Sequence, residues 1–329
     1  MPVTPVRHTP APTEAALNAA FHAVGASGPA CTPLAVEHRE RRTNARLEVR
    51  YADGRTLVVK IGDEEWRRQR FAASRAACGL LLRRTGIVVP DPVPLDGTRP
   101  HPPMEAYWKI EAPTLAELWP RLDGPARGRA LQTWGELLRR VHRVRPHGHG
   151  PLPAAERQPG SLEAHLIADL GERLLPAVRQ TWPQAADWVE RLADAVPAIA
   201  ARAEEPVLLH GDPHHGNVLC RPHGRGYRCV GFLDLEAAWA GPPEADVAVA
   251  ELIHGPLFAP LPAGWTEEFR RGYGTSLDSA SLAFYRGMHL ANLGYHAALT
   301  GMDAHATDVL AAFRATVVTV RRLLRSSAS

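Results

Sequence analysis

Lysine is nearly absent from this chain of 329 residues, because arginine supplies all of its 38 basic residues except Lys60 and Lys109. A sequence so rich in Arg, Ala and Pro is typical of a GC-rich genome, in which lysine persists most readily where arginine cannot replace it. Net charge is also scarce: the chain carries only +3, and no basic run is interleaved with aromatic residues. Nucleic-acid binding therefore has no electrostatic basis in the sequence.

Cysteines and long apolar runs are equally sparse. The four cysteines show no C-x-x-C spacing, and we expect Cys220 and Cys229 to be reduced thiols, as in an intracellular enzyme. Met1–Pro12 has no apolar core of a secretory signal. No uninterrupted apolar run approaches the ~20 residues that cross a membrane. These absences predict a cytoplasmic protein without a membrane partner.

Two segments near the middle of the chain carry the strongest chemical signal. His210–Asn217 has the sequence HGDPHHGN, and Phe232–Glu236 has the sequence FLDLE. Between them, the apolar and β-branched runs Val218–Cys220 and Tyr227–Leu233 predict two antiparallel strands around the turn-prone residues 221–226. The two segments are therefore expected to meet at one end of a hairpin.

This hairpin would bring three polar side chains together. Asn217 enters its first strand and Asp234 follows its second, so the two would lie close enough to hold one hard cation through oxygen ligands. Asp212 lies on the loop beside them. A free carboxylate next to metal-held phosphates suits phosphoryl transfer, because the carboxylate deprotonates an alcohol while the metal neutralises phosphate charge.

The spacing H-x-D-x-x-x-x-N before a strand-end Asp resembles the catalytic loop of protein-kinase-like enzymes. His-Gly-Asp followed by Asp-Leu-Glu is similar to the aminoglycoside phosphotransferase and choline kinase family, and Gly241–Asp246 resembles its G-x-x-x-x-D segment. The resemblance implies that Asp212 is the catalytic base, that Asn217 and Asp234 hold Mg²⁺, and that Asp246 supports the catalytic loop.

Two neighbours of the catalytic Asp have expected roles as well. His210 should orient the loop by hydrogen bonding. Protein kinases commonly carry Arg directly before this Asp to receive an activation-loop phosphate, and Gly211 stands there instead. Control by phosphorylation is therefore not expected.

The resemblance also identifies a site for ATP or GTP. Leu47–Tyr51 and Leu57–Ile61 read as strands joined by a hairpin turn, and the family's phosphate-binding lysine occupies the second strand, where Lys60 lies. The alternative is an ordinary surface lysine. Further nucleotide contacts are expected from the loop before this hairpin, which lacks G-x-G-x-x-G and could equally be a polar turn, and from the backbone between lobes: Thr43, Asn44, Ile110, Glu111 and Ala112.

One expected partner is missing. In the resembled enzymes an acidic residue on the helix after the lysine pairs with it, and counting back from Gly86–Pro90 places this position near Arg75. The helix expected at 64–84 has acids only at its start, Glu64 and Glu65. Either one of these turns inward, or the register differs, or the lysine is held in another way, or the protein only binds nucleotide.

The expected fold class is α+β with a two-lobed, protein-kinase-like architecture. Residues 1–111 should form an N-lobe of antiparallel sheet plus helix, and 112–329 a mainly helical C-lobe that carries the catalytic hairpin. Within the C-lobe, Pro146–Gly160 is expected to be a loop. Helices are expected at 13–24, 64–84, 127–144, 161–181, 184–202, 247–253, 267–273, 279–299 and 304–324.

The implied activity is transfer of the γ-phosphate of ATP or GTP to a hydroxyl of a small molecule, an antibiotic of the aminoglycoside or nucleoside type. A kinase of a primary metabolite such as choline, homoserine or a sugar is the alternative. Acidic residues after Asp246 are offset by arginines and histidines, so a neutral acceptor fits at least as well as a polycation. A rival hypothesis is a zinc hydrolase that uses the cluster His210, Asp212, His214 and His215.

Overall fold

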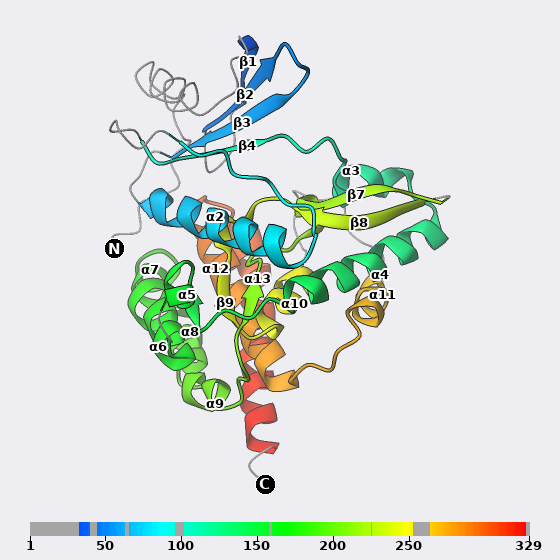
Figure 1. The fold of residues 1–329 in the computed structure, drawn as a ribbon. Helices are drawn as coiled ribbons and strands as arrows, with labels where there is room; N and C mark the ends of the chain where they lie inside the picture. The colour runs from blue at the N-terminus through cyan, green and yellow to red at the C-terminus, as the bar shows by residue number, and fades with distance from the viewer. Residues whose placement is uncertain are drawn as a thin grey trace.

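The computed structural model describes residues 33–39, 45–62, 66–95, 102–157, 160–224, 226–252 and 264–326. A small sheet lobe lies over a larger, mainly helical lobe (Figure 1). The expected helix at 13–24 and the residues Thr43, Asn44, Glu64 and Glu65 lie outside this part of the chain.

The small lobe contains an antiparallel sheet in the order β1-β2-β3-β4. Its strands are β1 (Pro33–Arg39), β2 (Ala45–Tyr51), β3 (Thr56–Ile61) and β4 (Met104–Trp108). The predicted β2–β3 hairpin is confirmed: its turn is closed by Tyr51 N donating to Arg55 O at 2.9 Å, and Gly54 takes the left-handed conformation at φ 84°. Alternate residues of β2 and β3 form a small core with β4: Leu47, Val49, Leu57, Val59, Ile61 and Met104.

Helix α2 (Trp66–Arg84) lies between this sheet and the helical lobe (Figure 1). Most of its buried residues, among them Ala77, Leu80 and Leu81, belong to the hydrophobic core of the large lobe, whereas the sheet has a core of its own. The segment after α2 is hydrogen-bonded to the hairpin of the large lobe, because Val88 N donates to Val230 O at 3.0 Å. Helix α2 is therefore anchored to the large lobe.

The large lobe begins with a long amphipathic helix. Helix α4 (Gly124–Val141) starts three residues before its predicted beginning because the side chain of Asp123 caps it, accepting from Ala126 N at 2.8 Å. The buried Trp134 stacks on Trp265 with ring centroids 5.8 Å apart. The other helical elements that the structure describes are α3 (Leu115–Leu118), η1 (Trp119–Arg121), α5 (Ala154–Arg157), α6 (Leu162–Ile167), η2 (Ala168–Leu174), α7 (Leu175–Thr181), η3 (Pro183–Ala185), α8 (Ala186–Ala193), α9 (Val196–Ala200), η4 (His215–Asn217), η5 (Leu235–Ala237), α10 (Glu244–Glu251), α11 (Trp265–Tyr273), α12 (Ser279–Leu299) and α13 (Asp303–Ser326).

The hairpin predicted from Val218 to Leu233 is confirmed, with longer strands than expected. Strands β7 (Val218–His223) and β8 (Gly226–Phe232) pair from Val218–Phe232 to His223–Gly226, so most of the predicted turn is strand. The segment expected as the loop Pro146–Gly160 also contains short elements, β5 (Gly150–Pro151) and α5 (Ala154–Arg157), because β5 pairs with β9 (Trp239–Gly241). Strand β9 pairs in turn with β6 (Val207–Leu209).

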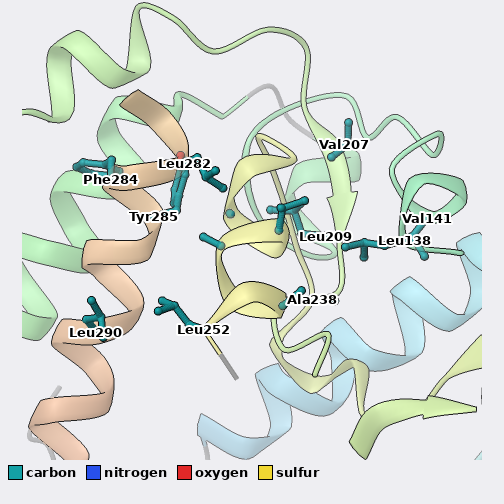
Figure 2. Packing of buried hydrophobic residues seen from close by; sticks show 14 of the residues in the cluster. Leu138, Val141, Val207, Leu209, Ala238, Leu252, Leu282, Phe284, Tyr285 and Leu290 are labelled. Carbon is teal, nitrogen blue, oxygen red and sulfur yellow. The ribbon is translucent and has the colours of Figure 1, made fainter. Parts of the chain in front are cut away.

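The strand that leads into the catalytic loop is anchored in the core. Figure 2 shows Leu209 of β6 among labelled side chains that include Leu252, directly after α10, and Tyr285 of α12. Leu208 and Leu209 are completely buried. The core therefore fixes the position at which the loop after β6 begins. Within the described residues, no helix is both long and apolar enough for a membrane span.

Candidate active site

The catalytic loop begins at His210, directly after β6. His210 is fully buried, and burial lowers the pKa of its ring. Its Nδ1 accepts from Asp212 N at 3.2 Å, so Nε2 carries the proton that it donates to Leu233 O at 2.8 Å. Nε2 therefore ties the loop to the residue that follows β8, while Nδ1 braces the loop internally. The role of His210 in orienting the loop stays a prediction that this geometry favours.

Asp246 lies beneath the loop in the first turn of α10. Its carboxylate accepts from His210 N at 2.7 Å and from Gly211 N at 2.8 Å. His142, directly after α4, adds a contact from Nε2 at 3.1 Å and is itself bonded through Nδ1 to the hydroxyl of Tyr273 at 2.8 Å. The carboxylate thus joins two consecutive loop N–H groups to the core of the large lobe. The part of His142 in this network is visible only in the fold.

Gly211 allows the catalytic loop to touch the loop after β8. It takes φ 82°, and a Cβ at this position would lie 2.0 Å from the carbonyl oxygen of Ala237. Any side chain at residue 211 would push the two loops apart. The atom that it would meet, the carbonyl oxygen of Ala237, belongs to the backbone and cannot rotate away as a flexible side chain could.

Asn217 and Asp234 meet at the same end of the hairpin, as predicted. Leu233 N donates to Asn217 O at 2.8 Å, and Asn217 Nδ2 donates to Asp212 O at 3.0 Å. This second bond uses Nδ2 of the amide, so Oδ1 is the atom of Asn217 that could bind a cation. Asp234 takes the left-handed conformation (φ 60°, ψ 59°), a conformation shared by no other non-glycine residue that the structure describes. Such strained backbone concentrates at functional sites.

Asp212 combines exposure with an altered acidity. Its side chain is 45% exposed and so remains within reach of an acceptor. Burial of the carboxylate by the surrounding protein, together with the negative charges of Asp234 and Asp246, raises its pKa to about 7. A general base works best when its pKa lies near the operating pH. The role of Asp212 as the base stays a prediction that this geometry favours.

Lys60 points from β3 at the loop after β8. Its Nζ lies 2.9 Å from Asp234 Oδ1 and 2.6 Å from Glu236 Oε1. Burial acts to lower the pKa of Lys60, but the carboxylates of Asp234, Glu236 and Glu105 keep it well above its ordinary value. The strand position of Lys60 and its charged surroundings distinguish it from an ordinary surface lysine.

The acid that holds this lysine does not come from α2. Arg75 is exposed and donates through Nη1 to Met104 O at 3.3 Å, and no residue of α2 is acidic. Glu236, in the turn η5 (Leu235–Ala237), takes the place that was expected near Arg75. Sequence reasoning missed Glu236 as a partner, although its place two residues after Asp234 was visible in the Asp-Leu-Glu motif.

The connection between the lobes lies against the hairpin. Ala112 N donates to Ile110 O at 3.0 Å, and Cys220 N donates to Pro113 O at 2.9 Å. Lys109 is held by Glu48 through a contact of 3.0 Å. The purine contacts expected from Ile110, Glu111 and Ala112 stay a prediction.

The donor set suits a hard cation better than zinc. Asn217 Oδ1 and the Asp234 carboxylate are oxygen ligands of the kind that Mg²⁺ uses when nucleotide phosphates and water complete its shell. In the rival zinc cluster, His210 has both ring nitrogens engaged and His214 Nδ1 accepts from Gly216 N at 3.0 Å. Over the described ranges, no group of three or more His, Cys, Asp and Glu is placed to hold a metal.

Residues 35–286 match the profile of the Phosphotransferase enzyme family. The match covers well over half of the sequence. The chain belongs to this family. Its membership agrees with the resemblance that the motifs carry, and no curated protein matches the sequence.

Solved structures share the phosphotransferase fold. The GDP and kanamycin complex of APH(2″)-IIIa is 14% identical, with 90% of this chain and 97% of that chain covered and a TM-score of 0.62. The macrolide 2′-phosphotransferase MphH from Brachybacterium faecium is 17% identical, with 90% and 97% covered and a TM-score of 0.57. A putative fructosamine-3-kinase from Thermobifida fusca is 21% identical, with 92% and 98% covered and a TM-score of 0.60. At these identities the likeness shows the fold alone, and it confirms the predicted two-lobed, kinase-like α+β class.

Proposed function

We propose that this phosphotransferase moves the γ-phosphate of ATP or GTP to a hydroxyl group of a small molecule. The observation that carries the proposal is the convergence of Lys60 from β3, Asp212 from the loop after β6, and Asn217 and Asp234 from the open end of the hairpin on one place. A lysine for phosphates, two oxygen ligands for a cation and a carboxylate with a raised pKa are the parts that phosphoryl transfer needs.

In the proposed reaction Asp212 takes the proton of the acceptor hydroxyl. The hydroxyl oxygen forms a bond to the γ-phosphorus as the bond from that phosphorus to the β,γ-bridging oxygen breaks, and the nucleoside diphosphate leaves. Lys60 places its charge on the phosphates. Asn217 and Asp234 would hold Mg²⁺, which supplies neutralisation of phosphate charge when bound.

The surroundings of Asp212 bear on the acceptor. The ring of His214 is electrostatically coupled to His289 of α12, and His289 is coupled to His296 of the same helix. Burial lowers the pKa of His214 and His289 to about 4, so both rings are neutral at pH 7. Neutral imidazoles offer hydrogen bonds but no attraction for a polycation. A nucleoside-type antibiotic with free hydroxyls therefore suits these two rings at least as well as an aminoglycoside does.

A transfer assay with γ-labelled ATP and GTP tests the proposal. Acceptors should include nucleoside antibiotics, kanamycin, hygromycin B, a macrolide, choline, homoserine and fructosamine. We expect magnesium-dependent labelling of at least one hydroxylated antibiotic. Labelling of a metabolite alone would replace the antibiotic assignment with the metabolite-kinase alternative, and labelling of no acceptor together with no binding of either nucleotide would contradict the proposed function.

A further inference from the structure

Helix α2 has no carboxylate with which to hold Lys60. Its sequence from Trp66 to Arg84 contains no Asp or Glu. The α2 residue that reaches toward the lysine's neighbourhood is Ser74, which is buried and hydrogen-bonds to Glu105. Glu105 is paired across the sheet with Lys60. The Glu105 carboxylate is already hydrogen-bonded to Ser74. The pairing of Glu105 with Lys60 across the sheet therefore does not by itself explain where the Lys60 ammonium points.

Glu236 contacts the ammonium from the loop after β8. Its Oε1 lies 2.6 Å from Lys60 Nζ, and its side chain is only 10% exposed. The lysine is nearly as buried, at 12%. Asp234, the other contact of Lys60, has a side chain that is 48% exposed. The two carboxylates thus differ: one is enclosed with the lysine, and the other opens to the space where nucleotide and cation are proposed to bind.

The turn that carries Glu236 is held from two directions. Turn η5 packs against α2, which is itself part of the core of the large lobe. On its other side, the Ala237 carbonyl lies in direct contact with Gly211 of the catalytic loop. A carboxylate on such a turn is a fixed point, whereas the lysine is a flexible four-carbon stem.

We propose that Glu236 is the positioning residue of Lys60, performing from the loop after β8 the task that a carboxylate on α2 cannot perform in this chain. When Asp234 turns to the cation, Glu236 keeps the ammonium directed at the phosphates. The placement of Lys60 then depends on the same loop that holds the cation, and not on α2. The inference rests on the proposed function, since it assigns a role within nucleotide binding.

A double-mutant cycle of Glu236→Gln and Lys60→Met tests the proposal. The readouts are calorimetric affinity for Mg·ADP and Mg·GDP, and kcat and KM for nucleotide hydrolysis with water as acceptor. We expect Glu236→Gln to lower kcat on the order of 10-fold, with a smaller change in KM, because interacting residues in such cycles are coupled by roughly 2- to 150-fold. In the Lys60→Met background, Glu236→Gln should change kcat by less than about 2-fold, since a residue that acts through Lys60 has nothing left to position.

Two further variants separate positioning from a general effect of charge. Glu236→Asp keeps the charge on a shorter side chain and should recover part of the lost kcat. Glu48→Gln removes the partner of the other lysine, Lys109, held at 3.0 Å, and should leave nucleotide affinity and kcat unchanged. Thermal unfolding of each variant confirms that it is folded, and Glu236→Asp enters the same cycle if the Gln variant is not.

Additive effects of Glu236→Gln and Lys60→Met would overturn the inference while leaving the proposed function intact, because Glu236 would then act independently of the lysine. A parental kcat in Glu236→Gln would do the same. Failure of the parent protein to bind either nucleotide with Mg²⁺ would instead overturn the proposed function and the inference with it.

Discussion

The proposed reaction assigns Asp212 to the acceptor hydroxyl, whereas it assigns Asp234 to the cation that binds the nucleotide phosphates. Asp212→Asn should therefore lower turnover about 10²- to 10⁴-fold, the usual cost of losing a general base, with little change in nucleotide affinity. Transfer kinetics and calorimetry with Mg·ADP measure the two effects. Asp187→Asn, an exposed residue of α8, serves as the matched control. Turnover within about threefold of the parent, far short of that range, would remove Asp212 from the mechanism.

Asp234 has two properties that two substitutions separate. Asp234→Ala removes the carboxylate and also places alanine in the left-handed conformation, which Asn tolerates better. We expect both Asp234→Ala and Asp234→Asn to lose magnesium-dependent nucleotide affinity, because the charge is absent in both. Alanine should in addition lower the thermal midpoint. Calorimetry with and without Mg²⁺ measures the first effect, and an Asn variant with parental metal dependence would count against Asp234 as a ligand.

Lys60 lies between carboxylates at 2.9 and 2.6 Å, with its Nζ 5.9 Å from the centre of the Tyr107 ring. Lys60→Arg should impair turnover strongly although it keeps the charge, because a planar fork on a longer stem cannot occupy the place of a compact ammonium. Steady-state kinetics with ATP provide the measurement, with Lys109→Arg as the control. Near-parental activity of both Lys60→Arg and Lys60→Ala would make Lys60 an ordinary strand residue.

For single residues, the sequence predicted spatial neighbours best where the two residues are joined by a short, local element of the chain. Asn217 and Asp234 meet because two short strands join them. Glu236 and His142 escaped prediction as partners, since their contacts with Lys60 and Asp246 span 176 and 104 residues. No local pattern encodes such a distance.

Among the helices and strands, hydrophobic periodicity and capping residues predicted that an element exists better than they predicted the residues at which it begins and ends. Helix α12 has its predicted bounds because Asp278 caps it, accepting from Ser281 N at 2.8 Å. The hairpin strands exceed their predicted length because Arg221, Pro222 and His223 read as turn residues, yet antiparallel pairing continues through them. Pro222 can occupy this ribbon since it has no second neighbouring strand to supply with an N–H.

The burial of His289 on helix α12 predicts how the stability of the folded protein changes at acid pH. Burial, with a smaller effect of His296, lowers the pKa of His289 from 6.5 to about 4 in the folded state. Between these values the unfolded chain binds the proton more readily, so the stabilising effect of a neutral His289 is present above pH 6.5 and lost as pH falls toward 4. The loss between pH 7.5 and 5 is about 2 kcal/mol for this residue.

Urea unfolding of the parent and of His289→Gln at both pH values measures this effect. The variant should lose about 2 kcal/mol less than the parent on acidification. His223→Gln, at the exposed end of β7, is the control and should follow the parent. Equal acid sensitivity in all three proteins would show that His289 is not the group responsible.

At the scale of the whole molecule, the packing of α2 shows that the boundary along the chain and the boundary between the hydrophobic cores differ. The proposed boundary at residue 111 follows the chain, yet α2 shares the hydrophobic core of the large lobe and leaves the sheet with a core of its own. The contact of Lys60 with Asp234 and Glu236 crosses between these two cores. A nucleotide bound at that contact should therefore stabilise both lobes together.

Mg·ADP or Mg·GDP at about 100 times its dissociation constant should stabilise the folded state by about 2.7 kcal/mol, because it binds only the folded chain. Thermal unfolding measures the rise in midpoint, and excess EDTA should abolish most of it. A midpoint that is unchanged by nucleotide at saturating concentration would contradict nucleotide binding across the two lobes.

The close approach at Gly211 has a consequence for how a cell could control this protein. An arginine that receives an activating phosphate cannot be acquired at this position, since even a Cβ would lie 2.0 Å from the Ala237 oxygen. The two loops are already in contact without any covalent signal. We therefore expect that an arginine directly before Asp212 could evolve only together with a displacement of the loop after β8.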